Sequence, residues 1–231
     1  SNTTMDKTIH WSSSNKDAVT VDDEGNIKAV GPGEAIITAE TVNGIKDTCN
    51  VKSIISVKSI GLNTQNETME KGKTCQLEAT INPNDVTEDK TLSWTSSNTK
   101  VATVDNTGKV TAVGGGTATI TVKSQNGKEA SCEVKVTSKI ESISLNKSNI
   151  TLSKGTSETL KATINPSDTT DDKKLKWTSS NPNIATVDED GKVTGLSLGE
   201  TIITVETSNG KKAECKVTVV KQTPKVEYQT H

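Results

Sequence analysis

Short runs in which apolar and polar residues alternate cover most of the chain. In its last third the apolar positions recur with a period of two at 160–164, 175–177, 185–187, 203–205 and 215–219. This period is typical of a strand that buries one face, and no stretch shows the 3.6-residue period of a helix. The pattern therefore predicts an all-β chain.

Turn signals separate these runs. Asn-Pro occurs at 165–166, Asp-Gly at 190–191 and Asn-Gly at 209–210. Such pairs favour tight connections between antiparallel strands. About seven short strands within some 80 residues indicate an immunoglobulin-like sandwich of two sheets.

The pattern is repeated along the chain at a fixed step of 83 residues. The step links Trp11, Trp94 and Trp177, and it needs no gap. It also links the glycines at 25, 108 and 191 and the cysteines at 49, 132 and 215. We interpret the chain as three copies of one module.

The copies are not equally complete. Ser1 aligns with Asn84 and Ser167, so the first copy lacks the roughly 27 residues that open the others. We divide the chain into a truncated module at 1–56, complete modules at 57–138 and 139–220, and a linker or tail at 221–231. Either the sequence is a fragment, or something else supplies the missing strands. We expect the first module to be less ordered than the others, or completed by a strand from another chain.

The connectors between modules are a few residues long and carry no Gly or Pro run. Such connectors restrict motion between modules, so we expect an elongated, semi-rigid array. At about 3.3 Å per residue, strands of eight residues give each module on the order of 30–40 Å.

Composition supports small modules rather than one large core. Hydrophobic residues make up 30% of the chain, aromatic residues 2%, and Phe is absent. The net charge of −2 and the absence of Arg give no footprint for nucleic acid. No apolar run approaches the length of a membrane span, so we expect no membrane insertion.

One recurring set of motifs carries a family resemblance. Trp-Thr-Ser-Ser-Asn at 94–98 and 177–181 is followed by Ala-Thr-Val-Asp, Gly-Lys-Val-Thr and a Cys-x-Val-x-Val strand. This resembles the group 2 bacterial immunoglobulin-like domain. The resemblance implies an immunoglobulin-like fold in bacterial surface or secreted proteins, including adhesins and enzymes with separate catalytic domains. It carries over no catalytic residue.

The tail departs from the repeat. Residues 226–231 resemble the opening of the clostridial hydrophobic repeat with a conserved Trp, which is another surface module. Together with the Lys- and Asn-rich composition, this suggests a low-GC Gram-positive source.

Three kinds of residue are candidates for sites. Trp11, Trp94 and Trp177 could stack on sugars, but each shares a strand face with an apolar residue, which favours a core role. Cys75 and Cys132 could form a disulfide; the alternative is that they are buried free thiols, as expected for Cys49 and Cys215. Asp188 and Asp190 could bind calcium, but the rest of a calcium-binding loop is missing and a turn that needs a Gly at positive φ explains them better.

Catalysis has little support. The two histidines, His10 and His231, lie at opposite ends of the chain, so no Ser-His-Asp or Cys-His set forms within one module. We predict a non-enzymatic repeat region without cofactors. It would act as an extracellular spacer, or as an adhesion module for a cell-wall or host-surface glycan or protein. The alternative is an accessory region of an extracellular glycan- or cell-wall-active enzyme.

Overall fold

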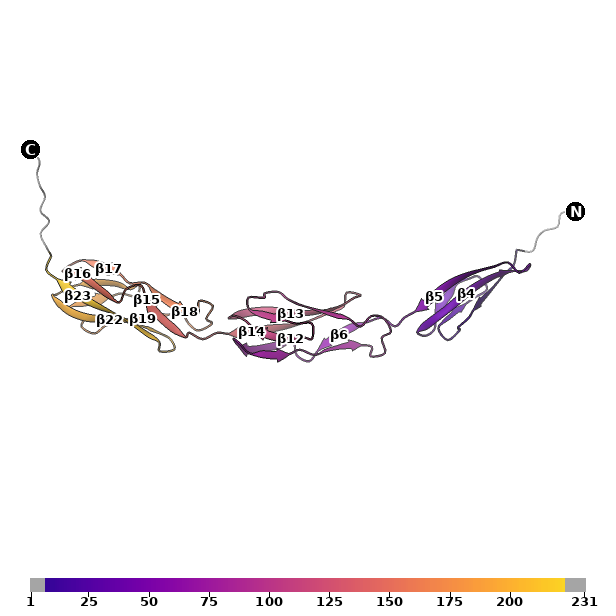
Figure 1. Cartoon of the computed structure of the whole chain (residues 1–231), viewed down its shortest axis with the longest axis horizontal. Coiled ribbons are helices and arrows are strands. Elements are labelled where there is room, and N and C mark those ends of the chain that lie inside the picture. Colours follow the sequence, from indigo (N-terminus) through magenta and orange to yellow (C-terminus); the bar gives the residue numbers. More distant parts are fainter. Residues whose placement is uncertain (1–6, 223–231) are drawn as a thin grey trace, which may run out of the picture.

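The computed structural model describes residues 7–222, and strands are its only regular secondary structure. Figure 1 shows three groups of strands that follow one another in an extended row, with the first and third modules at its two ends. This confirms the predicted all-β fold of tandem immunoglobulin-like modules. The resemblance noted for 226–231 lies outside the described residues.

The strands of the three modules are as follows. The first module contains β1 (Ile9–Ser13), β2 (Val19–Val21), β3 (Ile27–Ala29), β4 (Gly33–Thr41) and β5 (Lys46–Ser53). The second contains β6 (Ser59–Leu62), β7 (Asn66–Glu70), β8 (Thr74–Gln76), β9 (Ala79–Asn82), β10 (Leu92–Ser96), β11 (Ala102–Val104), β12 (Lys109–Ala112), β13 (Gly116–Ser124) and β14 (Glu129–Thr137). The third contains β15 (Ser142–Leu145), β16 (Asn149–Ser153), β17 (Ser157–Thr159), β18 (Ala162–Asn165), β19 (Leu175–Ser179), β20 (Ala185–Val187), β21 (Lys192–Gly195), β22 (Gly199–Thr207) and β23 (Lys212–Val220).

The two complete modules share one topology. In the second module, one sheet has the order β10-β13-β14-β7, the other has β11-β12-β8, and β6 pairs with β9. The third module repeats this arrangement as β19-β22-β23-β16, β20-β21-β17 and β15-β18. The pairs β14–β7 and β23–β16 are parallel, and all others are antiparallel.

Each complete module has nine strands, where the sequence predicts about seven. The opening segment divides because β6 pairs with β9, whereas β7 crosses over to β14. The next segment divides at Leu77, since β8 pairs with β12 in the opposite sheet. Alternation of apolar residues continues through such a crossing, so it does not reveal where the hydrogen-bonding partner changes.

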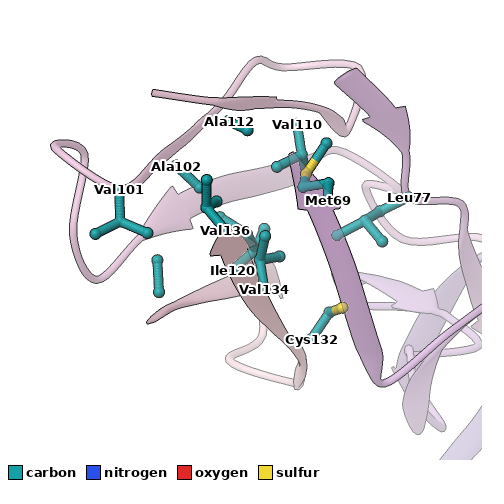
Figure 2. Packing of buried hydrophobic residues seen from close by; sticks show 11 residues of the cluster. Met69, Leu77, Val101, Ala102, Val110, Ala112, Ile120, Cys132, Val134 and Val136 are labelled. Carbon is teal, nitrogen blue, oxygen red and sulfur yellow. The ribbon is translucent and has the colours of Figure 1, made fainter. Parts of the chain in front are cut away.

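The core of the second module lies between its two sheets. Figure 2 shows Leu77, Val110, Ile120 and Val134 close together in this layer, together with Met69. The third module has an equivalent cluster around Leu160, Val193, Ile203 and Val217. The periodic apolar residues of the sequence thus form a thin core in each module, and the second module has a further buried cluster of Val57, Ile60, Val86 and Val122.

The first module has a much smaller core. Its buried residues are Ala18, Val19, Ala35 and Ile37, with Trp11, Val21 and Val51 packed at the border. Its sheets are β1-β4-β5 and β2-β3. The described residues include no counterpart of β7 or β8 in this module, so one edge of each sheet is unpaired.

Candidate functional site

The three tryptophans lie against the cores of their modules. Trp94 and Trp177 are half-buried and pack against the apolar clusters of the second and third modules, and Trp11 does the same in the first. A glycine covers each indole: a Cβ built on Gly191 would lie 2.8 Å from Cζ2 of Trp177. The part of the ring beside this glycine is therefore unavailable to a sugar.

A groove runs beside the tryptophan of each complete module. In the third module it has a volume of about 800 Å³ and is lined by Trp177, Lys174, Asp188, Glu189 and Glu206, among others. The second module has an equivalent groove of about 800 Å³ beside Trp94. Both grooves are open to solvent, and charged side chains lie along their rims.

In the acidic turns, the carboxylate of the first Asp accepts hydrogen bonds from backbone amides of the same turn. Oδ1 of Asp188 accepts hydrogen bonds from the backbone amides of Asp190 (3.1 Å) and Lys192 (2.9 Å). Asp105 does the same with Thr107 and Lys109, and the hydrogen bond from the Thr107 hydroxyl lowers the pKa of its carboxyl group. The part of the chain that the structure describes has no cluster of three or more His, Cys, Asp or Glu suited to a metal. The calcium candidates Asp188 and Asp190 thus occupy a carboxylate-capped turn.

All four cysteines are free thiols. Cys132 and Cys215 are buried and Cys75 is half-buried, but Cys49 is exposed, so the expectation of a buried thiol is wrong for Cys49. Burial raises the pKa of the Cys132, Cys75 and Cys215 thiols. The Cys75–Cys132 bridge considered from the sequence is not formed in the structure, and the buried thiols pack as small apolar groups.

His10 is exposed on β1, and its neighbour across the sheet is Glu40 on β4. No Ser or Cys among the described residues is hydrogen-bonded to it. His231 lies outside the described residues. Within 7–222, no helix has the length and apolarity needed to cross a membrane.

Several side-chain hydrogen bonds and ion pairs lie at the joint between the second and third modules. Asp168, in the loop after β18, reaches back to the second module. Its carboxylate accepts a hydrogen bond from the Gly115 amide (2.9 Å) and pairs with Nζ of Lys71 at 3.1 and 3.2 Å. The Gly115 hydrogen bond, followed by Lys71, lowers the pKa of Asp168. We call Asp168, Gly115 and Lys71 the clasp.

A second ion pair crosses the same joint. Nζ of Lys139, in the connector, lies 2.9 Å from Oε1 of Glu70 at the end of β7. This pairing lowers the pKa of Glu70 and raises that of Lys139. Both side chains are largely exposed, so the pair orients the connector more than it adds stability.

The connector itself is fixed to the third module. The Ser138 carbonyl accepts hydrogen bonds from the Thr170 amide (2.7 Å) and the Thr169 hydroxyl (2.8 Å). The Ile140 amide donates to Asp171 Oδ2 at 2.8 Å, and Asn209 Nδ2 donates to the Ile140 carbonyl at 2.8 Å. Hydrogen bonds therefore hold both backbone amide and backbone carbonyl groups of the connector.

The first joint shares only part of this arrangement. The Ile55 amide donates to the Thr87 hydroxyl, and the Thr87 amide donates to the Ile55 carbonyl. The side-chain amide of Asn126 donates to the Val57 carbonyl at 2.9 Å, as Asn209 does to Ile140 at the second joint. However, Pro32 stands at the position of Gly115 and has no amide hydrogen to donate. Asp85, the counterpart of Asp168, makes no hydrogen bond or ion pair to a described residue of the first module.

The sequence alone does not reveal the clasp. Its one signal is the run Gly114-Gly115-Gly116, where a small residue permits close approach. A Cβ on Gly115 would lie 2.1 Å from the Asp168 carbonyl oxygen, so the loop of the third module requires glycine there. The partner is 53 residues away in the sequence.

Comparison with known proteins gives several partial matches. The chain is 35% identical over 165 residues to an uncharacterized protein of Clostridium acetobutylicum, covering 70% of this chain and 17% of that protein. It is 29% identical over 220 residues to ice-binding protein 1 of Shewanella frigidimarina, covering 92% and 24%. It is 45% identical over 83 residues to lacto-N-biosidase of Bifidobacterium bifidum, covering 36% and 7%. The chain thus spans less than a quarter of the length of these relatives.

Among solved structures, the S-layer protein rSbsC(31-844) aligns with a TM-score of 0.44 and 23% identity, over 96% of this chain and 36% of that one. The family model described as "Bacterial Ig-like domain (group 2)" matches residues 1–51, 56–134 and 139–217. These matches cover most of the chain and follow the 83-residue repeat. The chain therefore belongs to the group 2 bacterial Ig-like domain family.

Proposed function

We propose that this chain is a non-catalytic, semi-rigid spacer in a bacterial cell-surface or secreted protein. A spacer needs length that grows with copy number and joints that resist bending. The tandem arrangement supplies the first property (Figure 1). The second rests on one observation, the clasp at the joint between the second and third modules.

Bending at this joint would break contacts on both sides of the connector. The clasp fixes the loop after β18 to the second module, and the Ser138 and Ile140 bonds fix the connector to the third. Ser138 and Thr169 are also buried, so water cannot readily replace their bonds. These contacts support a preferred angle between the two modules.

Removing the clasp should increase bending without unfolding either module. We expect Asp168→Ala to shorten the maximum dimension and broaden the pair-distance distribution in small-angle X-ray scattering. The reason is that the variant loses the Gly115 hydrogen bond and the Lys71 ion pair together, while the core stays unchanged.

Asp85→Ala is the matched control, because Asp85 occupies the equivalent position of the first joint without these contacts. We expect its scattering curve to match that of the parent chain. Identical curves for Asp168→Ala and the parent, with both variants folded, would contradict the role of the clasp.

Adhesion is a second candidate function, supported by the grooves beside Trp94 and Trp177. Their charged rims suit a polar ligand such as a cell-wall or host-surface glycan or protein. Because Trp177 also supports the core, changing it would unfold the module. Lys174→Ala and Glu189→Ala test the groove instead, and saturable binding lost in these variants would favour adhesion over a pure spacer.

An accessory role beside an enzyme is the third candidate. Lacto-N-biosidase of B. bifidum and kappa-carrageenase of Pseudoalteromonas carrageenovora match this chain over 83 and 74 residues, close to one module each. The observation supports a module that accompanies catalytic domains. Fusing the chain to a glycan-active domain and finding altered turnover on polymeric, but not soluble, substrate would favour it.

A further inference from the structure

Each module carries an Asn-Gly pair in the turn between its two longest strands. The pairs lie at 43–44, 126–127 and 209–210, one repeat apart, in the turns β4–β5, β13–β14 and β22–β23. An asparagine followed by glycine is especially prone to deamidation, because glycine places no side chain beside the backbone nitrogen that attacks the asparagine side chain. All three asparagines are exposed, so water reaches each turn.

The three turns have nearly the same local geometry. The φ angles of Gly44, Gly127 and Gly210 are +82°, +83° and +83°. Each glycine amide donates to the carbonyl three residues before it, at 2.9, 3.0 and 3.0 Å. The hydroxyl of that same earlier residue donates to the side-chain carbonyl of the asparagine in all three turns. The turns thus form a matched series within one chain.

In the third module, the asparagine of this turn also holds the connector. Nδ2 of Asn209 donates to the Ile140 carbonyl at 2.8 Å and to Oδ2 of Asp171 at 3.2 Å. The same Oδ2 accepts a hydrogen bond from the Ile140 amide at 2.8 Å. The side-chain amide is therefore the donor that joins the turn to both the connector and the loop after β18.

The second module repeats this arrangement and the first module does not. Nδ2 of Asn126 donates to the Val57 carbonyl at 2.9 Å and to Oε1 of Glu88 at 2.8 Å. Nδ2 of Asn43 donates to no carbonyl or carboxylate among the described residues. Asn43 therefore gives an internal reference for the same turn without a bound connector.

We propose that Asn126 and Asn209 are deamidation sites that the bound connector protects, and that conversion of either one releases its connector. In the reaction, the backbone nitrogen of the following glycine bonds to the side-chain carbonyl carbon, the bond from that carbon to the side-chain nitrogen breaks, and ammonia leaves. Water then opens the cyclic imide and leaves aspartate or isoaspartate. The sequence of steps needs no oxidant or reductant.

The product cannot make the bonds of the starting amide. A carboxylate at position 209 has no proton to donate, and it would face the Ile140 carbonyl and the Asp171 carboxylate. Two hydrogen bonds are lost and a like charge is added, so the connector detaches. Conversely, the side chain must leave these partners before its carbonyl carbon can meet the glycine nitrogen, so the reaction requires local opening. This coupling holds whether or not the chain acts as a spacer.

Conversion rates in the intact chain test the protection. The chain is incubated in mildly alkaline buffer, and mass spectrometry of its peptides follows each asparagine separately. We expect Asn43 to convert at least about fivefold faster than Asn126 and Asn209. Asp171→Ala should accelerate conversion of Asn209 only, and Glu88→Ala should accelerate conversion of Asn126 only. Equal rates at the three asparagines of the parent chain would overturn the proposal.

Hydrogen exchange of the Ile140 amide tests the release. In Asn209→Asp we expect this amide to exchange at least about tenfold faster than in the parent chain. Asn126→Asp is the matched control and should leave exchange at Ile140 unchanged. The same acceleration should appear in the fraction of aged parent protein that is converted at Asn209 and separated by charge, so the test does not depend on the folding of a variant. Unchanged exchange at Ile140 in that fraction would overturn the proposal.

Discussion

Gly191 lies against the indole of Trp177 and adopts a φ of +78°. A Cβ there would lie 2.8 Å from the ring and 2.6 Å from the Leu160 carbonyl oxygen. The glycine therefore meets two requirements, a left-handed backbone and a close approach to the ring. Gly25 and Gly108 meet the same ring contact in their own modules.

We expect Gly191→Ala to lower the free energy of unfolding of the third module by about 2–4 kcal/mol, because backbone strain adds to overpacking. Urea denaturation followed by Trp fluorescence measures this. Gly210→Ala is the matched control: its φ is +83°, but nothing lies within 4 Å of a Cβ. The control should cost only about 1–2 kcal/mol. Equal losses of unfolding free energy in the two variants would show that the contact with the ring does not contribute to stability.

The sequence predicts the residues of this contact but not the contact itself. The spacing identifies Trp177 and Gly191 as fixed points of the repeat, and the Asp-Gly pair predicts the turn. The turn brings the glycine onto the ring only because β20 and β21 fold back over β19, which local periodicity does not encode. Likewise, Asp188 is recognisable as acidic, but its bonds to two amides of its own turn appear only in the structure.

At the scale of the element, β22 shows the two faces that period two predicts. Ile203 is fully buried, whereas its neighbour Ile202 is 42% exposed. The same alternation recurs in β13 and β23. Ile202 and Ile203 thus have the same side chain but face opposite sides of the strand, one toward solvent and one toward the core.

We expect Ile203→Ala to destabilise the third module by about 2–5 kcal/mol, through lost burial and a cavity. Ile202→Ala should cost less than about 1 kcal/mol, since its side chain already contacts water. Thermal unfolding monitored by circular dichroism compares the two variants. Similar shifts in melting temperature would contradict the assignment of faces.

Strand count is the part of the element pattern that sequence reasoning underestimates. Residues 59–70 and 74–82 each contribute to two pairings. Side-chain alternation indicates which face of a strand is buried, but it does not indicate which neighbouring strand provides the hydrogen bonds. The break at Leu77 is therefore invisible in the sequence, although its burial is predicted.

At the scale of the whole molecule, repetition predicts a row of modules, but the angle between them depends on repeat positions at which the copies differ, such as Gly115 and Pro32. Gly115 and Asp168 form the clasp, whereas Pro32 and Asp85 occupy the same positions without forming one. Such pairs lie far apart in the sequence, so only the structure brings them together. We expect the second joint to be stiffer than the first for this reason.

Acid should loosen the second joint. The pKa of Asp168 lies below its ordinary value of 3.8, and that of Glu70 below 4.5. A lowered folded pKa means that the contribution is present above the ordinary value and is lost as pH falls through the folded value. We expect the maximum dimension from scattering to stay constant from about pH 7 to 5 and to decrease below pH 3.8. Asp168→Ala should lack most of this response, and an unchanged response in that variant would assign it to other groups.

Residual dipolar couplings of backbone amides test the semi-rigid array most directly, because they report the relative orientation of modules in solution. Couplings from 57–138 and 139–220 should fit one alignment tensor with the arrangement of Figure 1. Couplings from the first module, which has no clasp, should show a smaller alignment magnitude. Separate tensors of different magnitude for the second and third modules would contradict the account.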